Sequence, residues 1–390
     1  MTYFMRTLPH VEDILADMDK IIDQELIPAI TEGHVCSEDE RKLLSLPVRM
    51  GGLGIPIFSE ICSREYVASS RITQQLTENI MNQTIQLDLD ADIQKQIESE
   101  IKRERQEHHL ALLESLKTRM SNDQLRANDI AQMKGASAWL NALPLKDEGY
   151  SLSKREFFDA IALRYRWSLK RLPNSCSCSK KPAFEPDHAM NCLTGGFIHR
   201  RHDGVRDILA QIMKDVTYDV STEPMLQPLS GEILPQGTNI EDEARLDIKA
   251  RGFWGREEMA FFDVRIFNPF ARSHINTNLE AVFRQNEVLK KKEYAERVIR
   301  VEHGTFTPIV LSAYGGYGLE TSKFISTLIN KVAEKHDQNV SEVAKYIRTK
   351  LSFHLVRSQV LCIRGSRTLR APCINVGEME IVQGQSSIRT

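Results

Sequence analysis

The second half of the chain alternates between two hydrophobic patterns. Residues 199–215 and 276–299 carry apolar side chains among polar ones in the manner of amphipathic helices. Short runs rich in β-branched and aromatic residues predict strands, and these runs are residues 217–226, 245–250, 259–267 and 306–313. The resulting order, αβββαβ, predicts an α/β domain with a mixed central sheet.

The first half of the chain carries patterns typical of helices. Residues 9–30 place apolar side chains on one face, with Pro9 suited to a first turn and Gly33 to a stop. Residues 87–133 contain no glycine or proline and predict one or two long amphipathic helices. A further helix is expected after Ser153, which suits an N-cap. We therefore expect a helical N-terminal half before the α/β core, and disorder in residues 376–390.

Composition agrees with a globular protein and adds one local asymmetry. Among 390 residues, 41% are hydrophobic and 27% charged, and the net charge is −2. Between Arg164 and Arg206, however, nine basic residues face three acidic ones. Such a segment is typical of a surface that binds a polyanion, although an ordinary solvated surface is the alternative. We find no secretory segment or membrane-length apolar run, and therefore expect a soluble intracellular protein.

Three of the seven cysteines lie close together with a histidine. An odd number of cysteines with one tight group favours a metal site over a disulfide framework. The group, called here the CCHC cluster, would complete a tetrahedral zinc site of the structural type, although free cysteines in a loop are the alternative. His199 and His202 are near enough in sequence to replace one ligand. The cluster consists of Cys176, Cys178, His188 and Cys192.

Two aspartates stand inside the apolar runs of the predicted strands. Asp247 and Asp263 are 16 residues apart, on neighbouring strands of a hairpin. Buried carboxylates are costly unless compensated, and two together favour a divalent cation such as magnesium or manganese. A single aspartate that simply faces solvent is the alternative.

The order of elements and acids resembles the PD-(D/E)xK nuclease fold of restriction enzymes. "RLD" (245–247) stands for the first motif and "DVR" (263–265) for the second, with Leu246 in place of proline and Arg265 in place of lysine. Arginine cannot act as a base because it stays protonated. The next helix contains "NEVLKKKEY", which resembles the lysine–tyrosine motif following the restriction-like endonuclease core of site-specific non-long-terminal-repeat retrotransposons; its candidate residues are Lys290, Lys291 and Tyr294.

Two further segments resemble the C-terminal region of a LINE-type retrotransposon polyprotein. Those elements place a CCHC knuckle just before the nuclease. "FMRTLPHVEDILADMDKIIDQELIPAI" followed by "LPVRMGGLGIP" looks like the thumb after a reverse-transcriptase palm. Because no YxDD motif is found, we expect no polymerase activity from this chain. The resemblance implies a thumb-like segment at 1–60, a helical linker at 61–172, a zinc knuckle at 173–198 and a nuclease at 199–375.

The resemblance also implies roles for individual residues in a nuclear, magnesium-dependent DNA endonuclease. Asp247 and Asp263 would hold magnesium or manganese, and Lys290 or Lys291 would orient the attacking water or stabilise the phosphate. Arg265 would contact phosphate. DNA, and element RNA as a second partner, would be bound by Arg164, Arg166, Lys170, Arg171, Arg200 and Arg201. Weaker candidates for a further acidic ligand are Glu243, Glu223 and Glu280. The alternative is a catalytically inactive nucleic-acid-binding remnant or domesticated scaffold.

Overall fold

Two units make up the chain, and their boundary falls within one helix. The structure, a computed structural model, describes residues 2–84, 91–178, 180 and 182–367. The first unit is Met1–Leu125, and the second begins at Arg126. The linker expected at 61–172 is therefore divided between the two units. The disorder expected at 376–390, and the end of the expected nuclease segment, lie outside the described residues.

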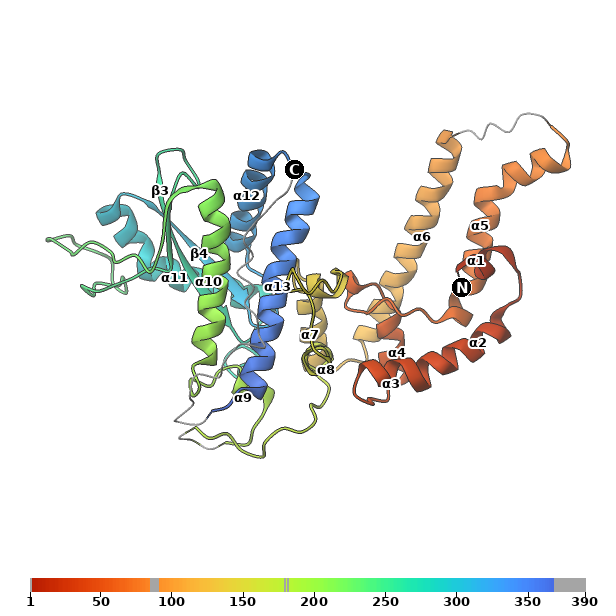
Figure 1. The fold of residues 1–390 in the computed structure, drawn as a ribbon, viewed down its shortest axis with the longest axis horizontal. Coiled ribbons are helices and arrows are strands. Elements are labelled where there is room, and N and C mark those ends of the chain that lie inside the picture. The colour runs from red at the N-terminus through yellow and green to blue at the C-terminus, as the bar shows by residue number, and fades with distance from the viewer. Residues whose placement is uncertain (1, 85–90, 179, 181, 368–390) are drawn as a thin grey trace. The chain divides into compact units, whose positions relative to one another are not determined.

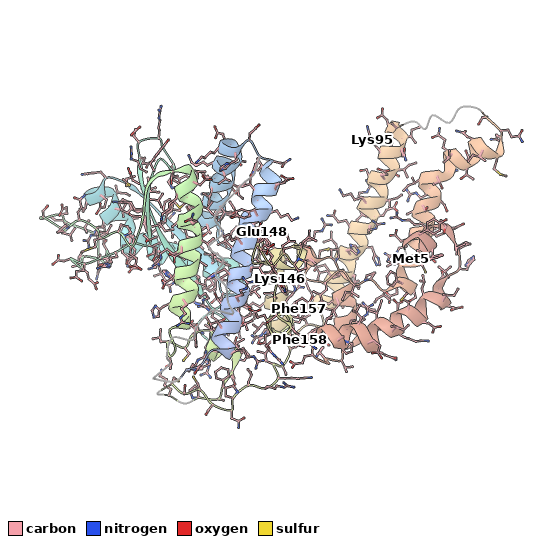
Figure 2. The ribbon with its side chains drawn as sticks, in the orientation of Figure 1. Met5, Lys95, Lys146, Glu148, Phe157 and Phe158 are labelled. Carbon is pink, nitrogen blue, oxygen red and sulfur yellow. The ribbon has the colours of Figure 1, made fainter. Side chains whose placement is uncertain are left out.

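The first unit is helical in its described part. The pattern at 9–30 forms two helices joined by a π-helical turn at Ile22–Leu26, so the prediction of helix there is confirmed. Met5 packs with Leu15 and Cys62 in one core of this unit (Figure 2). The helices are α1 (Thr2–Thr7), α2 (Glu12–Ile21), α3 (Ile27–Ile30), α4 (Glu38–Ser45), α5 (Phe58–Met81) and α6 (Ala91–Lys117).

The second unit opens with short helices. Ser153 caps one of them in a capping box with Glu156, as expected from the sequence. Phe158 of that helix is buried, and Phe157 packs edge-on against Trp139 at 6.0 Å between ring centroids (Figure 2). These helices are α7 (Asn122–Gln132), α8 (Lys154–Tyr165) and α9 (Pro186–Ala189).

A mixed sheet forms the centre of the second unit. The observed order of elements is αβββαβ, so the predicted α/β class with a mixed sheet is confirmed. Helices α12 and α13 were not predicted. The elements are α10 (Phe197–Val216), β1 (Tyr218–Thr222), β2 (Ile248–Arg251), β3 (Met259–Phe267), α11 (Leu279–Arg297), β4 (Thr305–Ser312), α12 (Leu319–His336) and α13 (Val340–Arg364).

The strands follow one another across the sheet in chain order. β1, β2 and β3 pair antiparallel, whereas β3 and β4 pair parallel because α11 crosses between them. Helices α10, α12 and α13 contribute to the core on one face of the sheet. Helix α11 packs on the other face through Phe283 and Tyr294 (Figure 1). No helix of the described residues is long and apolar enough to cross a membrane.

Helices α10 and α13 approach each other closely at Gly204. A Cβ built on Gly204 would lie 2.0 Å from Cε1 of His354, far inside van der Waals contact. His354 also lies with Nε2 3.1 Å from the backbone oxygen of Arg201. These contacts fix the start of α10 against α13, and α10 carries a residue of the candidate site.

Candidate active site and metal centre

The register of β2 and β3 brings the two aspartates together. Ile248 pairs with Phe262, and the backbone N–H of Asp247 donates to Phe262 O at 3.1 Å. Asp247 and Asp263 therefore stand on adjacent strands at the point where β2 begins. The sequence predicted this neighbourhood from hairpin geometry alone.

Asp263 is buried beside a lysine. Only 6% of the residue is exposed, and Nζ of Lys290 lies 3.1 Å from its Oδ2. That contact is an ion pair outside hydrogen-bonding geometry, so Oδ2 is buried without a hydrogen bond among the described residues. Burial, with the charge of Asp247, raises the pKa of Asp263 to about 6 against the opposing charge of Lys290. A buried carboxylate whose negative charge is only partly compensated is stabilised by an additional cation.

Lys290 reaches Asp263 from the helix that covers this face of the sheet. Its ammonium lies 3.3 Å from Oε2 of Glu293 and 5.2 Å from the ring centre of Tyr294. Burial opposes the charged form of Lys290, but the charges of Asp263 and Glu293 outweigh burial and raise its pKa. Lys290 is therefore a fixed cation and not a proton acceptor. Glu293 was not identified from the sequence, although it lies one turn from Lys290.

Of the two helix lysines, only Lys290 contacts an aspartate of the site. Nζ of Lys291 lies 3.1 Å from Oε1 of Glu320, at the first turn of α12. Arg265 follows Asp263 by two residues on β3, so it shares that face of the strand. Among the described residues we find no hydrogen bond or ion pair of Arg265. Its guanidinium is half-buried and available to an anion.

The three weaker acidic candidates are not part of the aspartate pair. Glu223 donates its backbone N–H to Asp247 O at 3.0 Å, but its carboxylate pairs with Arg206. Glu280 is exposed in the first turn of α11, ten residues before Lys290 and so roughly 15 Å along the helix. Glu243 is exposed, and its carboxylate forms no hydrogen bond or ion pair within the described ranges.

His202, on α10, joins the site from the opposite side of the sheet. Its Nε2 lies 2.9 Å from Val264 O and 3.2 Å from Asp247 Oδ2, and Nδ1 lies 3.3 Å from Asp203 Oδ1. Burial opposes protonation, but the hydrogen bond and charge of Asp247 raise the pKa of His202 to about 9. The sequence suggested His202 only as a spare zinc ligand. That suggestion is wrong, because the ring is bound to the aspartate strand.

The carboxylate oxygens without a hydrogen bond fit a divalent metal. Asp247 Oδ2 accepts from the N–H of Val264 at 2.6 Å, while Oδ1 has no hydrogen-bond donor within the described ranges. Asp263 Oδ2 likewise has no hydrogen bond. Two hard oxygen ligands on adjacent strands, with acceptor capacity unused, are suited to magnesium or manganese.

The CCHC cluster assembles as four ligand atoms within 4.8 Å of one another, so it could hold a metal ion such as zinc. Sγ of Cys176 and Cys192 are 3.8 Å apart, and Sγ of Cys178 is 3.8 Å from Nε2 of His188. A tetrahedron with zinc–sulfur bonds of about 2.3 Å has edges of about 3.8 Å. The donor set is therefore close to the required size.

Local structure explains why these four residues meet. The chain pairs with itself around the first two cysteines, through a bridge between Ser175 and Ala183. His188 lies on α9, and Cys192 lies three residues after the end of that helix. Arg367 contacts two rings that pack with the cluster, with its guanidinium 5.0 Å from the ring centre of Phe184 and 5.2 Å from that of Phe197. His199 is exposed and does not join the ligand set.

A second group of possible ligands has an ordinary structural explanation. His34, Cys36 and Glu40 offer ligand atoms within 4.8 Å of one another. Oε2 of Glu40, however, accepts from the backbone N–H of Ser37 at 2.8 Å, and the Ser37 side chain accepts from Glu40 N. This is a capping box at the start of α4.

The basic residues proposed to bind nucleic acid fall into two groups. Arg201 is 1% exposed, with its guanidinium against Met190 O, so the prediction that it contacts nucleic acid is wrong. Arg166 is held by Asp187 at 2.7 Å and stacks on Phe270, and Arg164 donates to Ser137 at 2.7 Å. These two are partly buried. The exposed residues are Lys170, Arg171 and Arg200.

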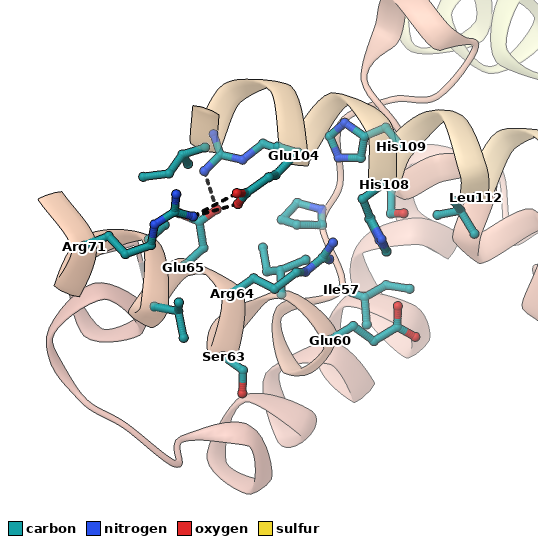
Figure 3. Close-up of a pocket in the computed structure, with 17 residues that line it drawn as sticks. Ile57, Glu60, Ser63, Arg64, Glu65, Arg71, Glu104, His108, His109 and Leu112 are labelled. Atoms are coloured by element: carbon teal, nitrogen blue, oxygen red, sulfur yellow. Dashed lines mark hydrogen bonds and ion pairs between the residues drawn. The ribbon is translucent and has the colours of Figure 1, made fainter. Parts of the chain in front are cut away.

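The first unit contains a cavity of about 410 Å³ between α5 and α6. Arg71 bonds Glu104 at 2.9 Å, and Arg105 bonds Glu65 at 2.6 Å, which joins the two helices (Figure 3). Arg64 and His108 point toward each other across the cavity (Figure 3). Glu65 and Glu104 already neutralise arginines, so these two carboxylates have a structural role in joining the helices.

Comparison with known proteins gives no assignment: neither a protein-family model nor a curated protein matches the chain.

Proposed function

We propose that this chain is a divalent-metal-dependent DNA endonuclease. The observation that carries the proposal is the meeting of Asp247, Asp263 and Lys290 at one end of the sheet, with two carboxylate oxygens free of hydrogen bonds. A metal held by two carboxylates can activate water at a phosphodiester, and a neighbouring lysine can stabilise the negative charge that develops. The exposed basic residues supply a reason to expect a polyanionic substrate.

Each residue has a role that follows from its contacts. Asp247 and Asp263 would hold magnesium through the carboxylate oxygens that accept no hydrogen bond. The bound ion would activate water and offset charge on the phosphodiester. Lys290, a cation fixed by Asp263 and Glu293, would stabilise the negative charge that grows on the phosphate. Arg265 on the same strand would bind a neighbouring phosphate oxygen.

The likeness to PD-(D/E)xK nucleases supports this proposal. The order αβββαβ, the acid at the start of β2 and the acid within β3 agree with the expected motif order. Arginine replaces lysine two residues after Asp263, and Lys290 supplies the missing ammonium from α11. The order of thumb-like segment, CCHC cluster and nuclease-like core is the reason to propose an origin in a LINE-type retrotransposon, with zinc in the cluster.

A non-catalytic nucleic-acid-binding scaffold is the second candidate. It is favoured by one observation: Lys290 and His202 already provide a positive partner for each aspartate. Because these protein cations compensate the charge of the aspartates, the fold can be stable without a metal and without catalysing any reaction. The two functions differ in whether DNA is cut.

A nicking assay distinguishes the two candidates. Purified protein is incubated with supercoiled plasmid and magnesium or manganese. We expect nicking by the wild type and losses of at least a hundredfold for Asp247→Ala and Asp263→Ala, because one carboxylate alone holds the ion poorly. The matched control is Asp242→Ala, in an exposed loop before β2. DNA binding without nicking in any metal would favour the scaffold.

A further inference from the structure

His202 contacts the two strands that carry the aspartates. It is the one described side chain that lies within 3.2 Å of both the Asp247 carboxylate and the backbone of β3. The Val264 carbonyl can only accept a hydrogen bond, so Nε2 must carry a proton and donate. A nitrogen that donates to protein oxygens has no lone pair for a metal. His202 is therefore not a ligand through Nε2.

The helix that carries His202 is fixed on both sides of this residue. On one side, the buried guanidinium of Arg201 lies against Met190 O, and the Arg201 carbonyl is bound by His354. On the other side, Gly204 allows the close approach of α13. The Cα of His202 thus has little freedom, and Asp203 holds the second ring nitrogen. A ring constrained in this way can define the direction of a neighbouring carboxylate.

The consequence falls on Asp247. Its Oδ2 receives the N–H of Val264 at 2.6 Å and the N–H of His202 at 3.2 Å. With Oδ2 bound twice, Oδ1 is the oxygen left for a cation. We propose that His202 is a positioning residue, which fixes the Asp247 carboxylate so that Oδ1 can ligate the metal shared with Asp263. This inference rests on the proposed function, since it assumes that the aspartate pair binds a divalent ion.

The proposal can be tested with two amides that differ in reach. Glutamine at 202 places its side-chain N–H near the position of Nε2, whereas asparagine reaches only the position of Nδ1. Manganese affinity is measured by calorimetry, without DNA, on the full zinc-containing chain. We expect His202→Asn to weaken manganese binding by ten- to a hundredfold, the usual cost of losing a partner of a metal ligand, and His202→Gln to retain affinity within about threefold.

The matched control is His199→Asn, on the same helix one turn earlier and exposed. It should bind manganese as the wild type does. The positioning role alone would be overturned by either of two results. In one, His202→Asn binds manganese as tightly as the wild type does; in the other, His202→Asn and His202→Gln lose manganese affinity equally. If the Asp247→Ala variant binds manganese as tightly as the wild type does, the proposed function is contradicted, and the inference with it.

Discussion

The CCHC cluster and the aspartate pair are both suited to a metal, yet they differ in whether protein cations compensate the negative charge of their ligands. The cluster gathers three sulfurs and one imidazole within 4.8 Å, and its cysteines are buried among apolar side chains. The aspartates instead have protein cations beside them, Lys290 at 3.1 Å and His202 at 3.2 Å. A carboxylate pair with its own counter-ions can fold without metal, whereas clustered thiolates have little other source of stability. The first site should therefore be structural, and the second exchangeable.

The largest effect that tests this comparison is loss of zinc. We expect about one zinc per chain in purified protein, and none in the double variant Cys178→Ser/Cys192→Ser, by elemental analysis. Structural zinc contributes on the order of 10 kcal/mol in small metal-binding folds, so the variant should also unfold at markedly lower denaturant concentration. Cys36→Ser is the control, because the group at His34 is a helix cap, and it should keep its zinc. Retained zinc in the double variant would remove the distinction between the sites.

The next effect concerns the lysine beside the exchangeable site. Lys290→Ala should reduce nicking on the order of a hundredfold, because it removes a preorganised charge from the reacting phosphate. Lys291→Ala is the matched control and should stay within a few-fold of wild type, since Lys291 pairs with Glu320. Arg265→Lys should be tolerated. Equal losses in the two lysine variants would mean that α11 acts through general charge and not through the contact with Asp263.

A smaller effect, on the pH dependence of stability, measures how well the protein compensates the buried charge of Asp263. Because the pKa of Asp263 is raised to about 6, the folded chain holds this proton more tightly than the unfolded chain does. The resulting stability is present below about pH 4 and is lost as the pH rises toward 6. Asp263→Asn should therefore match wild type near pH 4 and exceed it above pH 6 by roughly 3 kcal/mol, measured by urea unfolding in magnesium-free buffer. A difference that does not change with pH would show that Lys290 and solvent fully compensate the charge.

The smallest expected effect concerns the surface that would deliver DNA to the site. Replacing Lys170, Arg171 and Arg200 with alanine should flatten the dependence of DNA affinity on salt, by about 0.9 in logarithmic slope for each phosphate that the variant no longer neutralises. Fluorescence anisotropy over a salt series gives the slope. Arg201→Ala serves as a contrast: it should lower stability and leave the slope unchanged. An unchanged slope in the triple variant would place the binding surface elsewhere.

Sequence patterns predicted the α/β core because β3 and β4 are compact, largely buried apolar runs. The aspartates could be paired because the hairpin connection is short. The patterns did not predict α12 and α13, which follow the last predicted strand. The periodicity of α10 also bears on Arg201. Arg201 lies on the stripe of Phe197, Val205 and Leu209, all buried on α10. A basic residue on such a stripe is better interpreted as structural than as a phosphate contact.

The candidate site was predictable to the extent that its members are neighbours along the chain. Lys290 and Lys291 each lie three or four residues from both Glu287 and Tyr294, which are buried on α11. Spacing alone therefore cannot separate the two lysines, and only the packing of α11 on the sheet shows that Lys290 is the one beside Asp263. His202 could not be found in this way. It is 45 residues from Asp247, and the two meet only because α10 packs across the sheet.

The contact between Gly204 and His354 has a consequence for how related sequences can differ. Any side chain at position 204 would overlap the imidazole of His354, so the two positions cannot change independently. Among related sequences, we expect a residue larger than glycine at 204 only where 354 carries a smaller one. Covariation between these positions would record the spacing of α10 and α13, and with it the evolutionary constraint on where His202 stands.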